Sequence, residues 1–221
     1  MKAMILSAGR GERMRPLTDS LPKPLLEVHS KPLIVWHIEK LVKSGFEEII
    51  INIAHLGEKI VDYLGDGSKY GIKIIYSDER DEGALESAGG IVKALALLGN
   101  EVFMVVNGDV YSDYEFDSKF DLGDDLAHLI LVENPPHNVD GDFTFEEGIV
   151  TNNDSNKKTF SGIAYYNPKM FTSLNYGKSA LAPLIREMIP TKKISASLHN
   201  GCWHDIGTPK RLEDINKGTK C

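Results

Sequence analysis

Short apolar runs alternate with amphipathic segments along the first half of the chain. Four runs rich in Ile, Val and Met have the length of buried strands, at residues 2–7, 48–53, 72–76 and 102–107. Between them, apolar residues recur at helical spacing over residues 32–44, 56–64 and 86–98. This alternation predicts parallel strands with right-handed crossovers, as in a doubly wound α/β sheet that binds ligands beyond the carboxyl ends of its strands.

The second half of the chain has a looser pattern with more turns. Pro, Asn and Gly separate predicted strands at residues 127–132, 143–145, 148–150 and 159–166, and helices at 181–188 and 208–216 bracket a last strand pair within 194–205. No internal repeat or low-complexity linker interrupts the chain. We therefore expect one α/β domain over residues 1–221, with a mixed, mostly parallel sheet flanked by helices.

Composition narrows the functional class. The 221 residues are 42% hydrophobic, which is ample for one core, and the net charge of −7 without a polybasic tail argues against a nucleic-acid binder. No segment has the roughly 18 apolar residues of a membrane span. Cys202 and Cys221 show no paired spacing, so we expect neither a disulfide framework nor a thiolate zinc site. These features predict a cytoplasmic protein in a reducing compartment, free of membrane and nucleic-acid partners.

The loop after the first strand carries the strongest chemical signal. It reads SAGRGERMRPLTDSLPKP over residues 7–24, and acidic residues dominate only later in the chain, between residues 101 and 160. Met14 breaks the dinucleotide fingerprint G-x-G-x-x-G, and no Gly-Lys pair completes a Walker A loop. Gly9 and Gly11 would let backbone N–H groups approach an anion closely. The alternative to anion binding is a loop whose basic side chains are simply solvated.

Several cations of this loop could face the anion. Arg10, Arg13 and Arg15 supply guanidinium groups, and we expect the prolines beside Lys23 to keep its segment extended, so that the ammonium points to one place. The position of the loop at a strand end favours phosphate binding over a simply solvated loop.

Two aspartates are candidate metal ligands. Asp109 follows the buried run 102–107 and Gly108, just beyond a strand end. Asp205 precedes Gly207 and Thr208, which can cap the following helix. Each could instead be an ordinary turn aspartate. Mg²⁺ typically takes one or two carboxylates and fills its octahedron with phosphate and water, so the pair would suit a phosphate-transfer site.

Taken together, these motifs resemble the signature of the sugar-1-phosphate nucleotidyltransferases. The resemblance covers Ala8-Gly-x-Gly-x-Arg13-x-x-Pro-Leu-Thr, Pro22-Lys23-Pro24, the stretch LESAGG at 85–90, Asn107-Gly-Asp and Trp203-x-Asp-x-Gly-Thr. It implies the Rossmann-like nucleotidyltransferase fold and the Mg²⁺-dependent reaction of a nucleoside triphosphate with a sugar 1-phosphate, giving a nucleotide sugar and pyrophosphate. The nucleotide-binding part of the domain would then span about residues 1–110 and the sugar-binding part about residues 111–221.

The resemblance also implies roles for individual residues. Arg13 and Lys23 would be catalytic, neutralising the phosphates of two mutually repelling anions, and the chemistry needs no nucleophilic side chain. Asp109 and Asp205 would hold Mg²⁺. The implied nucleotide-binding residues are Ala8, Gly9, Gly11, Glu12, Arg13, Lys23 and Glu86, although Glu86 could equally cap a helix. The implied sugar-phosphate-binding residues are Asn107, Gly141, Ser161 and Gly162, although Gly141 could simply form a hairpin turn.

Within that family the pattern is most similar to the bacterial N-acetylmuramate-1-phosphate uridylyltransferases of cell-wall recycling, which implies UTP and N-acetylmuramate 1-phosphate as substrates. Mannose-1-phosphate guanylyltransferases share most of it, and other hexose 1-phosphates stay open as acceptors. A non-catalytic nucleotide-sugar-binding protein is the competing class. A nicotinamide dehydrogenase is disfavoured by Met14. We expect a monomer or a small homo-oligomer.

Overall fold

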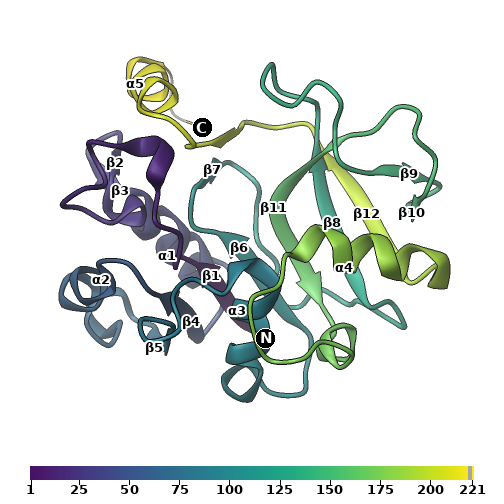
Figure 1. Cartoon of the computed structure of the whole chain (residues 1–221), viewed down its shortest axis with the longest axis horizontal. Helices are drawn as coiled ribbons and strands as arrows, with labels where there is room; N and C mark the ends of the chain where they lie inside the picture. The colour runs from purple at the N-terminus through teal and green to yellow at the C-terminus, as the bar shows by residue number, and fades with distance from the viewer. Residues whose placement is uncertain (219–220) are drawn as a thin grey trace.

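A mixed sheet forms the centre of the molecule (Figure 1). The computed structural model describes residues 1–218 and residue 221. Within this part of the chain the largest sheet has nine strands in the order β5-β4-β1-β6-β11-β8-β12-β10-β9. Its strands are β1 (Lys2–Leu6), β4 (Glu48–Ile53), β5 (Lys73–Asp78), β6 (Phe103–Asn107), β8 (Ala127–Val132), β9 (Thr144–Glu146), β10 (Ile149–Thr151), β11 (Thr159–Tyr166) and β12 (Ile194–His199).

The first half of the sheet is parallel, as the strand and helix alternation predicts. Strand β1 pairs in parallel with β4 on one side and β6 on the other, and β4 pairs in parallel with β5. Strand β11 then runs antiparallel to both β6 and β8, whereas β12 is parallel to β8. The predicted α/β class with a mixed sheet is confirmed. The carboxyl ends of β1, β4 and β6 consequently meet at one edge.

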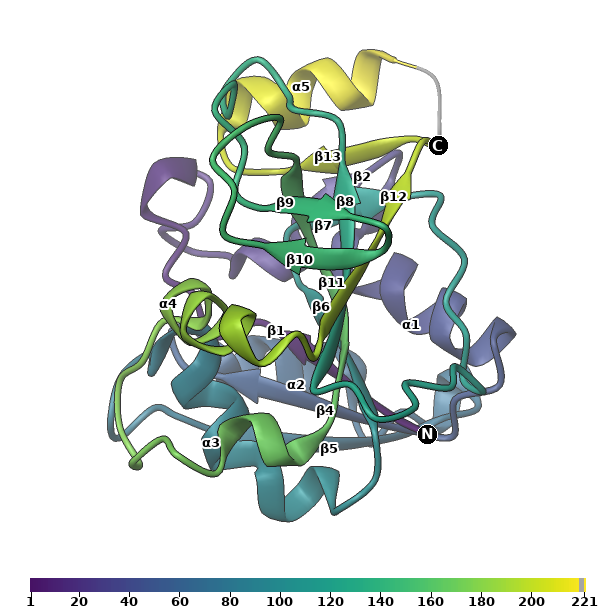
Figure 2. The ribbon, with the colours of Figure 1, turned by 90° about the vertical axis from the view of Figure 1, so that its right-hand side faces the viewer.

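Helices cover both faces of the sheet. They are α1 (Leu33–Lys43), α2 (Gly57–Leu64), α3 (Glu86–Leu98) and α4 (Leu181–Met188), whereas α5 (Pro209–Lys217) packs away from this sheet in a separate apolar cluster that includes Val28. Neighbouring residues of β1 divide between two apolar clusters, because successive side chains of a strand point to opposite faces. Met4 packs with α3 and α4, whereas Ala3 and Ile5 pack with α1 and α2. Figure 2 shows α1 on one side of the sheet, with α3 and α4 on the other.

Two small ladders lie beside the main sheet. They are β2 (Glu27–Val28) with β3 (Lys31–Pro32), and β7 (Val110–Ser112) with β13 (Trp203–Asp205). The prediction of a strand pair within residues 194–205 is wrong in its pairing. Strand β12 joins the main sheet beside β8, where Ile194 is fully buried, and β13 leaves it to pair with β7. Burial of an apolar strand in the main sheet thus outweighs a local hairpin.

The carboxy-terminal helix returns to the beginning of the chain. The Asn216 side chain accepts a hydrogen bond from the His29 N–H at 2.7 Å and donates one to the Glu27 carbonyl at 3.1 Å. At its other end, the Thr208 hydroxyl accepts a hydrogen bond from the Arg211 N–H, the cap that the sequence predicts. This places α5 beside the opening loop (Figure 1). In the described residues no helix combines the length and apolar character that crossing a membrane requires.

Candidate active site

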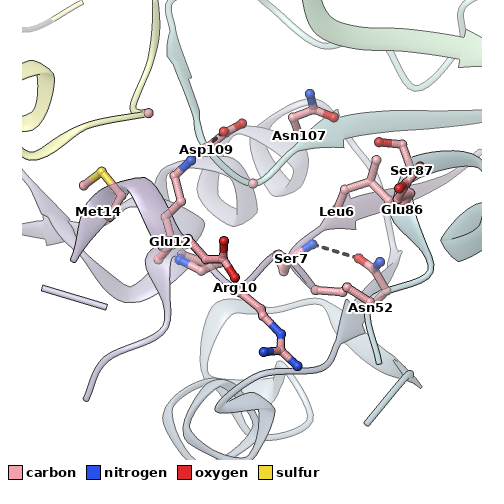
Figure 3. Close-up of a pocket in the computed structure, with 18 of the residues that line it drawn as sticks. Leu6, Ser7, Arg10, Glu12, Met14, Asn52, Glu86, Ser87, Asn107 and Asp109 are labelled. Carbon is pink, nitrogen blue, oxygen red and sulfur yellow. Dashed lines mark hydrogen bonds and ion pairs between the residues drawn. The ribbon is translucent and has the colours of Figure 1, made fainter. Parts of the chain in front are cut away.

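A cavity of about 610 Å³ opens at the carboxyl ends of β1, β4 and β6. Figure 3 shows its lining, with Ser7, Asp109 and Asn107 contributed from strand ends and the loops that follow them. Nine of the predicted site residues line it: Ala8, Gly9, Gly11, Glu12, Arg13, Lys23, Glu86, Asn107 and Asp109. The fold therefore gathers Arg10, Arg13, Lys23 and the first candidate metal ligand around one space. Arg15 lies outside this lining, where its exposed guanidinium pairs with Asp19 at 3.3 Å.

The glycine loop is held in shape by its own side chains. Gly11 has φ +64°, in the left-handed region, and starts a 3₁₀ turn over Glu12–Met14. The Thr18 hydroxyl donates a hydrogen bond to the Gly11 carbonyl at 2.8 Å, and a Cβ atom at Gly11 would lie 2.9 Å from the Thr18 methyl group. Met14 is buried, which anchors the turn to the core. Arg13, the residue before this anchor, is exposed and lines the cavity.

Lys23 faces Asp109 across the cavity. The ammonium lies 2.6 Å from Asp109 Oδ2, and the two side chains are 15% and 31% exposed. The expectation of an extended segment at Lys23 is wrong, because Lys23–Leu25 forms a 3₁₀ turn and only the flanking residues Pro22 and Leu26 are extended. The turn buries Pro24 and Leu25. This burial, and not a stiff extended backbone, fixes the direction of the Lys23 ammonium.

The backbone segments that carry Asp205 and Asp109 are neighbours. The Ile206 N–H donates to the Asp109 carbonyl at 2.8 Å, and Asp205 pairs with Val110 in the ladder of β13 and β7. Its carboxylate contacts Arg211 through Oδ2 and lies 2.8 Å from His137 Nε2 through Oδ1. Asp205 lines a second cavity and Gly207 lines the first, so this segment forms the wall between the two.

Glu86 begins α3 at the rim of the first cavity. It has φ +63°, the N-cap position of α3 is Leu85 and not Glu86, and Lys178 Nζ lies 3.4 Å from Glu86 Oε1. The capping alternative therefore loses its support within this geometry. An exposed carboxylate next to Ser87 can accept a hydrogen bond from a ligand donor.

The predicted sugar-binding residues divide into two groups. Asn107 lines the first cavity, and Gly162 packs against it: a Cβ atom at Gly162, where φ is +79°, would lie 2.6 Å from Asn107 Nδ2. Ser161 is buried, and its carbonyl accepts a hydrogen bond from Trp203 Nε1 at 2.9 Å. Gly141, Ser161 and Gly162 lie outside the lining of the first cavity. Their roles stay predictions.

Gly141 closes a turn against the segment that follows β10. It has φ +65°, and a Cβ atom there would lie 2.7 Å from the Lys157 carbonyl carbon. The neighbouring Asp142 carboxylate accepts a hydrogen bond from the Phe160 N–H at 2.8 Å. Gly141 thus ends a turn between β8 and β9, but these two strands are not neighbours in the sheet, so the turn is not the hairpin of the alternative interpretation. The bond from Phe160 ties this turn to β11, the strand that contains Gly162.

A buried polar network behind the cavity was missed by sequence reasoning. Asn52 accepts a hydrogen bond from the Ser7 N–H at 2.7 Å and donates one to Glu79 Oε1 at 2.7 Å (Figure 3 draws the first). Glu79 is fully buried and accepts a second bond from the Leu85 N–H at 2.8 Å. Burial raises the pKa of Glu79. The network ties the glycine loop to the loop before α3, and the one sequence signal was an Asn inside the apolar run 49–53.

The two cysteines meet in the fold. Cys202 and Cys221 form a disulfide with their Cα atoms 5.4 Å apart, and the His204 ring lies close to both sulfurs. The expectation of unpaired cysteines is therefore wrong. The pairing depends on Cys221 lying beside Cys202 in the fold, 19 residues away in the chain, which no local spacing reveals.

Comparison with known proteins assigns the chain to a family. The profile of the family described as nucleotidyl transferase matches residues 2–220. The chain belongs to the nucleotidyl transferase family. Among curated members it is 52% identical to the N-acetylmuramate alpha-1-phosphate uridylyltransferase of Neisseria meningitidis, covering 97% of this chain and 96% of that protein. It is 32% identical to the UTP–glucose-1-phosphate uridylyltransferase of Synechocystis, over 86% of this chain and 51% of that longer protein.

A solved structure supports the family fold of this nucleotidyl transferase. A crystal structure of a Bacillus anthracis protein, described as a glucose-1-phosphate thymidylyltransferase in complex with a sucrose, superposes with a TM-score of 0.86. The superposition covers 98% of this chain and 94% of that chain at 22% identity. The predicted sugar-1-phosphate nucleotidyltransferase architecture is thereby confirmed.

Proposed function

We propose that this nucleotidyl transferase moves the uridylyl group of UTP to N-acetylmuramate 1-phosphate. A phosphate oxygen of the sugar attacks the α-phosphorus of UTP, the bond between the α-phosphorus and its bridging oxygen to the β-phosphate breaks, and pyrophosphate leaves. The substrate pair rests on the 52% identity over nearly the full length of both chains with the Neisseria enzyme of that name. Identity falls to 32% for the glucose-1-phosphate relative.

One observation carries the mechanism, namely the convergence of Arg13, Lys23 and Asp109 on a single cavity. Two anions must approach each other, so the barrier is mainly electrostatic. The Lys23 side chain is only 15% exposed, which strengthens the field of its ammonium at the reacting phosphates. Arg13 can form two parallel hydrogen bonds to phosphate oxygens. We assign Lys23 to the two reacting phosphates and Arg13 to the triphosphate.

We propose that Asp109 and Asp205 hold Mg²⁺. The donor set suits this ion, because two carboxylates stand on hydrogen-bonded neighbouring segments and supply hard oxygen ligands. In the structure each carboxylate has a cationic partner, Lys23 for Asp109 and Arg211 for Asp205, so both positions already favour positive charge. When bound, the ion would neutralise phosphate charge and orient the triphosphate.

The nucleotide and sugar are assigned to the two parts of the chain expected from its sequence. The loop 7–14 and Glu86 would receive the base and triphosphate, and Asn107 with the segments around Gly141 and Gly162 would receive the sugar. We place the reaction in the cytoplasm, where nucleoside triphosphates are available, and in the recycling of cell-wall sugars. Monomer or small homo-oligomer is the state we expect.

A coupled assay of pyrophosphate release tests the proposal. The enzyme is incubated with Mg²⁺, with each of UTP, GTP, CTP, ATP and dTTP, and with the 1-phosphates of N-acetylmuramate, N-acetylglucosamine, glucose and mannose. We expect the highest kcat/KM for UTP with N-acetylmuramate 1-phosphate. Product from GTP and mannose 1-phosphate instead would assign the guanylyltransferase alternative. Nucleotide-dependent thermal stabilisation without product from any pair would favour a binding protein.

A further inference from the structure

A second cavity, of about 680 Å³, lies on the other side of the Asp205 segment. It is enclosed by α5, by β13 and by the loop that follows β8. The residues that line it are Pro135, Pro136, His137, Trp203, His204, Asp205, Thr208, Lys210, Arg211, Asp214, Ile215 and Gly218. It adjoins the first cavity, because Gly207 lines that cavity and its neighbour Thr208 lines this one.

Arg211 lies between a carboxylate and an imidazole in this second cavity. Its guanidinium contacts the Asp205 carboxylate and lies 3.1 Å from His137 Nε2, and its side chain is 24% exposed. A Cβ atom at Gly207 would lie 3.1 Å from Arg211 Nη2, so the guanidinium packs against the backbone between the cavities. Lys210, the preceding residue of α5, also lines the space. Two carboxylates, Asp205 and Asp214, line it as well.

The cavity also borders the segment predicted to receive the sugar. Trp203 lines it and donates a hydrogen bond from Nε1 to the Ser161 carbonyl. The loop 135–137 leads directly to the turn at Gly141. A substituent of a sugar seated over Asn107 and Gly162 can therefore point toward Arg211 while the sugar phosphate faces Asp109.

N-acetylmuramate has a substituent that requires such a partner. It differs from N-acetylglucosamine by a lactyl ether whose carboxylate is ionised at neutral pH. Burying this charge without a cation would be costly, and the planar fork of arginine fits a carboxylate with two parallel hydrogen bonds. We propose that Arg211, assisted by His137 and Lys210, binds the lactyl carboxylate and selects the acceptor. This inference rests on the proposed function.

Asp205 would take part through an exchange of partners. In the structure the Asp205 carboxylate accepts a hydrogen bond from the Arg211 guanidinium, the group that would bind the lactyl carboxylate. If Asp205 turns to a divalent ion, its charge is compensated there and Arg211 is left for the substrate carboxylate. Binding of the muramate acceptor and binding of the ion would then favour one another, because each releases a group that the other needs.

The test compares two acceptors that differ only in the lactyl group. Initial rates with UTP and Mg²⁺ are measured for N-acetylmuramate 1-phosphate and N-acetylglucosamine 1-phosphate, using wild-type protein and the variants Arg211→Met, Arg211→Lys, Lys210→Met and the control Lys217→Met. Calorimetry gives the Kd of each sugar phosphate with and without Mg²⁺. Lys217 lies on the same helix outside the cavity lining, where it pairs with Glu213.

We expect Arg211→Met to lower the ratio of kcat/KM between the muramate and glucosamine acceptors about 10- to 100-fold, the range for a hydrogen bond to a charged group. Arg211→Lys should recover part of this ratio, Lys210→Met should lower it by a few-fold, and Lys217→Met should leave it unchanged. The Kd of the muramate acceptor should rise in parallel, and in wild-type protein it should fall when Mg²⁺ is added.

Several results would overturn the inference. Equal losses for both acceptors in Arg211→Met and Lys210→Met would mean that these residues only support Asp205 and the fold. A wild-type enzyme that uses N-acetylglucosamine 1-phosphate but neither binds nor uses the muramate acceptor would refute the proposed substrate, and the inference with it. Unchanged ratios in folded Arg211→Met protein would refute the carboxylate site alone, leaving the proposed reaction intact.

Discussion

The Lys23 ammonium lies 2.6 Å from a carboxylate oxygen of Asp109, although 86 residues separate the two in the chain. The first residue comes from the loop after β1, and the second follows β6, the parallel neighbour of β1. Their contact joins the proposed phosphate-binding loop to the candidate metal ligand. Substrate phosphates and a divalent ion would each replace one half of this ion pair.

Replacing Lys23 by Met should lower kcat about 100- to 1,000-fold, the usual effect of removing one charge-stabilising group from a transition state. The free energy of unfolding should change by less than about 1 kcal/mol, because partly exposed ion pairs contribute little. Steady-state assays of pyrophosphate release and urea denaturation measure the two effects. Lys73→Met, which removes the exposed partner of Glu48, is the matched control. A Lys23→Met enzyme with wild-type kcat would remove Lys23 from the reaction.

Replacing Asp109 by Ala should abolish Mg²⁺-dependent turnover and leave the fold intact, because the side chain is partly exposed and the substitution removes little besides its ion pair with Lys23. Activity is titrated against Mg²⁺, and circular dichroism reports the fold. Asp124→Asn, an exposed substitution outside the cavity lining, serves as the control. Near-normal rates for Asp109→Ala at saturating Mg²⁺ would exclude it as a metal ligand.

Replacing Gly162 by Ala should raise KM for the sugar phosphate roughly tenfold or more, because the added Cβ atom displaces Asn107 from the cavity wall. The strained backbone alone should cost about 1 kcal/mol of stability. Gly123→Ala isolates this backbone cost, since Gly123 also has a positive φ and its Cβ atom would meet open space. If both variants keep the wild-type KM, the contact between Gly162 and Asn107 does not position the substrate.

Replacing Asn52 by Leu should reduce the free energy of unfolding by about 2–4 kcal/mol, because the Ser7 N–H and the buried Glu79 carboxylate both lose a partner. The KM for UTP should also rise, since these bonds hold the two loops on either side of the nucleotide site. Urea denaturation and steady-state kinetics provide the two readouts. A loss of stability with unchanged KM for UTP would separate the network from nucleotide binding.

Acid should destabilise the protein through His37. Burial, and secondly the positive charge of Lys40, lowers the pKa of His37 from 6.5 to about 4. Since the unfolded chain binds a proton at higher pH than the folded one, the stability due to the neutral ring is present above pH 6.5 and is lost as pH falls toward 4. Between about pH 7.5 and pH 5 the loss should be about 2 kcal/mol. In His37→Leu this part of the pH dependence should vanish. If the free energy of unfolding changes by the same amount between the two pH values in His37→Leu and in the wild-type protein, the assignment to His37 is contradicted.

Most of the regular structure could be predicted from local pattern. Helix α3, helix α4 and strands β4, β8 and β11 have the predicted bounds. The pairing of β7 with β13 could not be predicted, because the two short strands come from distant parts of the chain and no local pattern shows which strands become neighbours. Asn52 and Glu79 were missed for a related reason: a buried polar residue in an apolar run finds its partner in a different element.

The sequence by itself determined the order of strands and helices, the basic glycine loop and the side chains able to bind phosphate, because hydrophobic period and turn chemistry act over a few neighbouring residues. Only the tertiary structure decided that Lys23 meets Asp109, that Asp205 meets Arg211 and His137, and that Cys202 meets Cys221. These contacts depend on which strands become neighbours and in what register, and that choice is made by burial of the whole sheet between its helices.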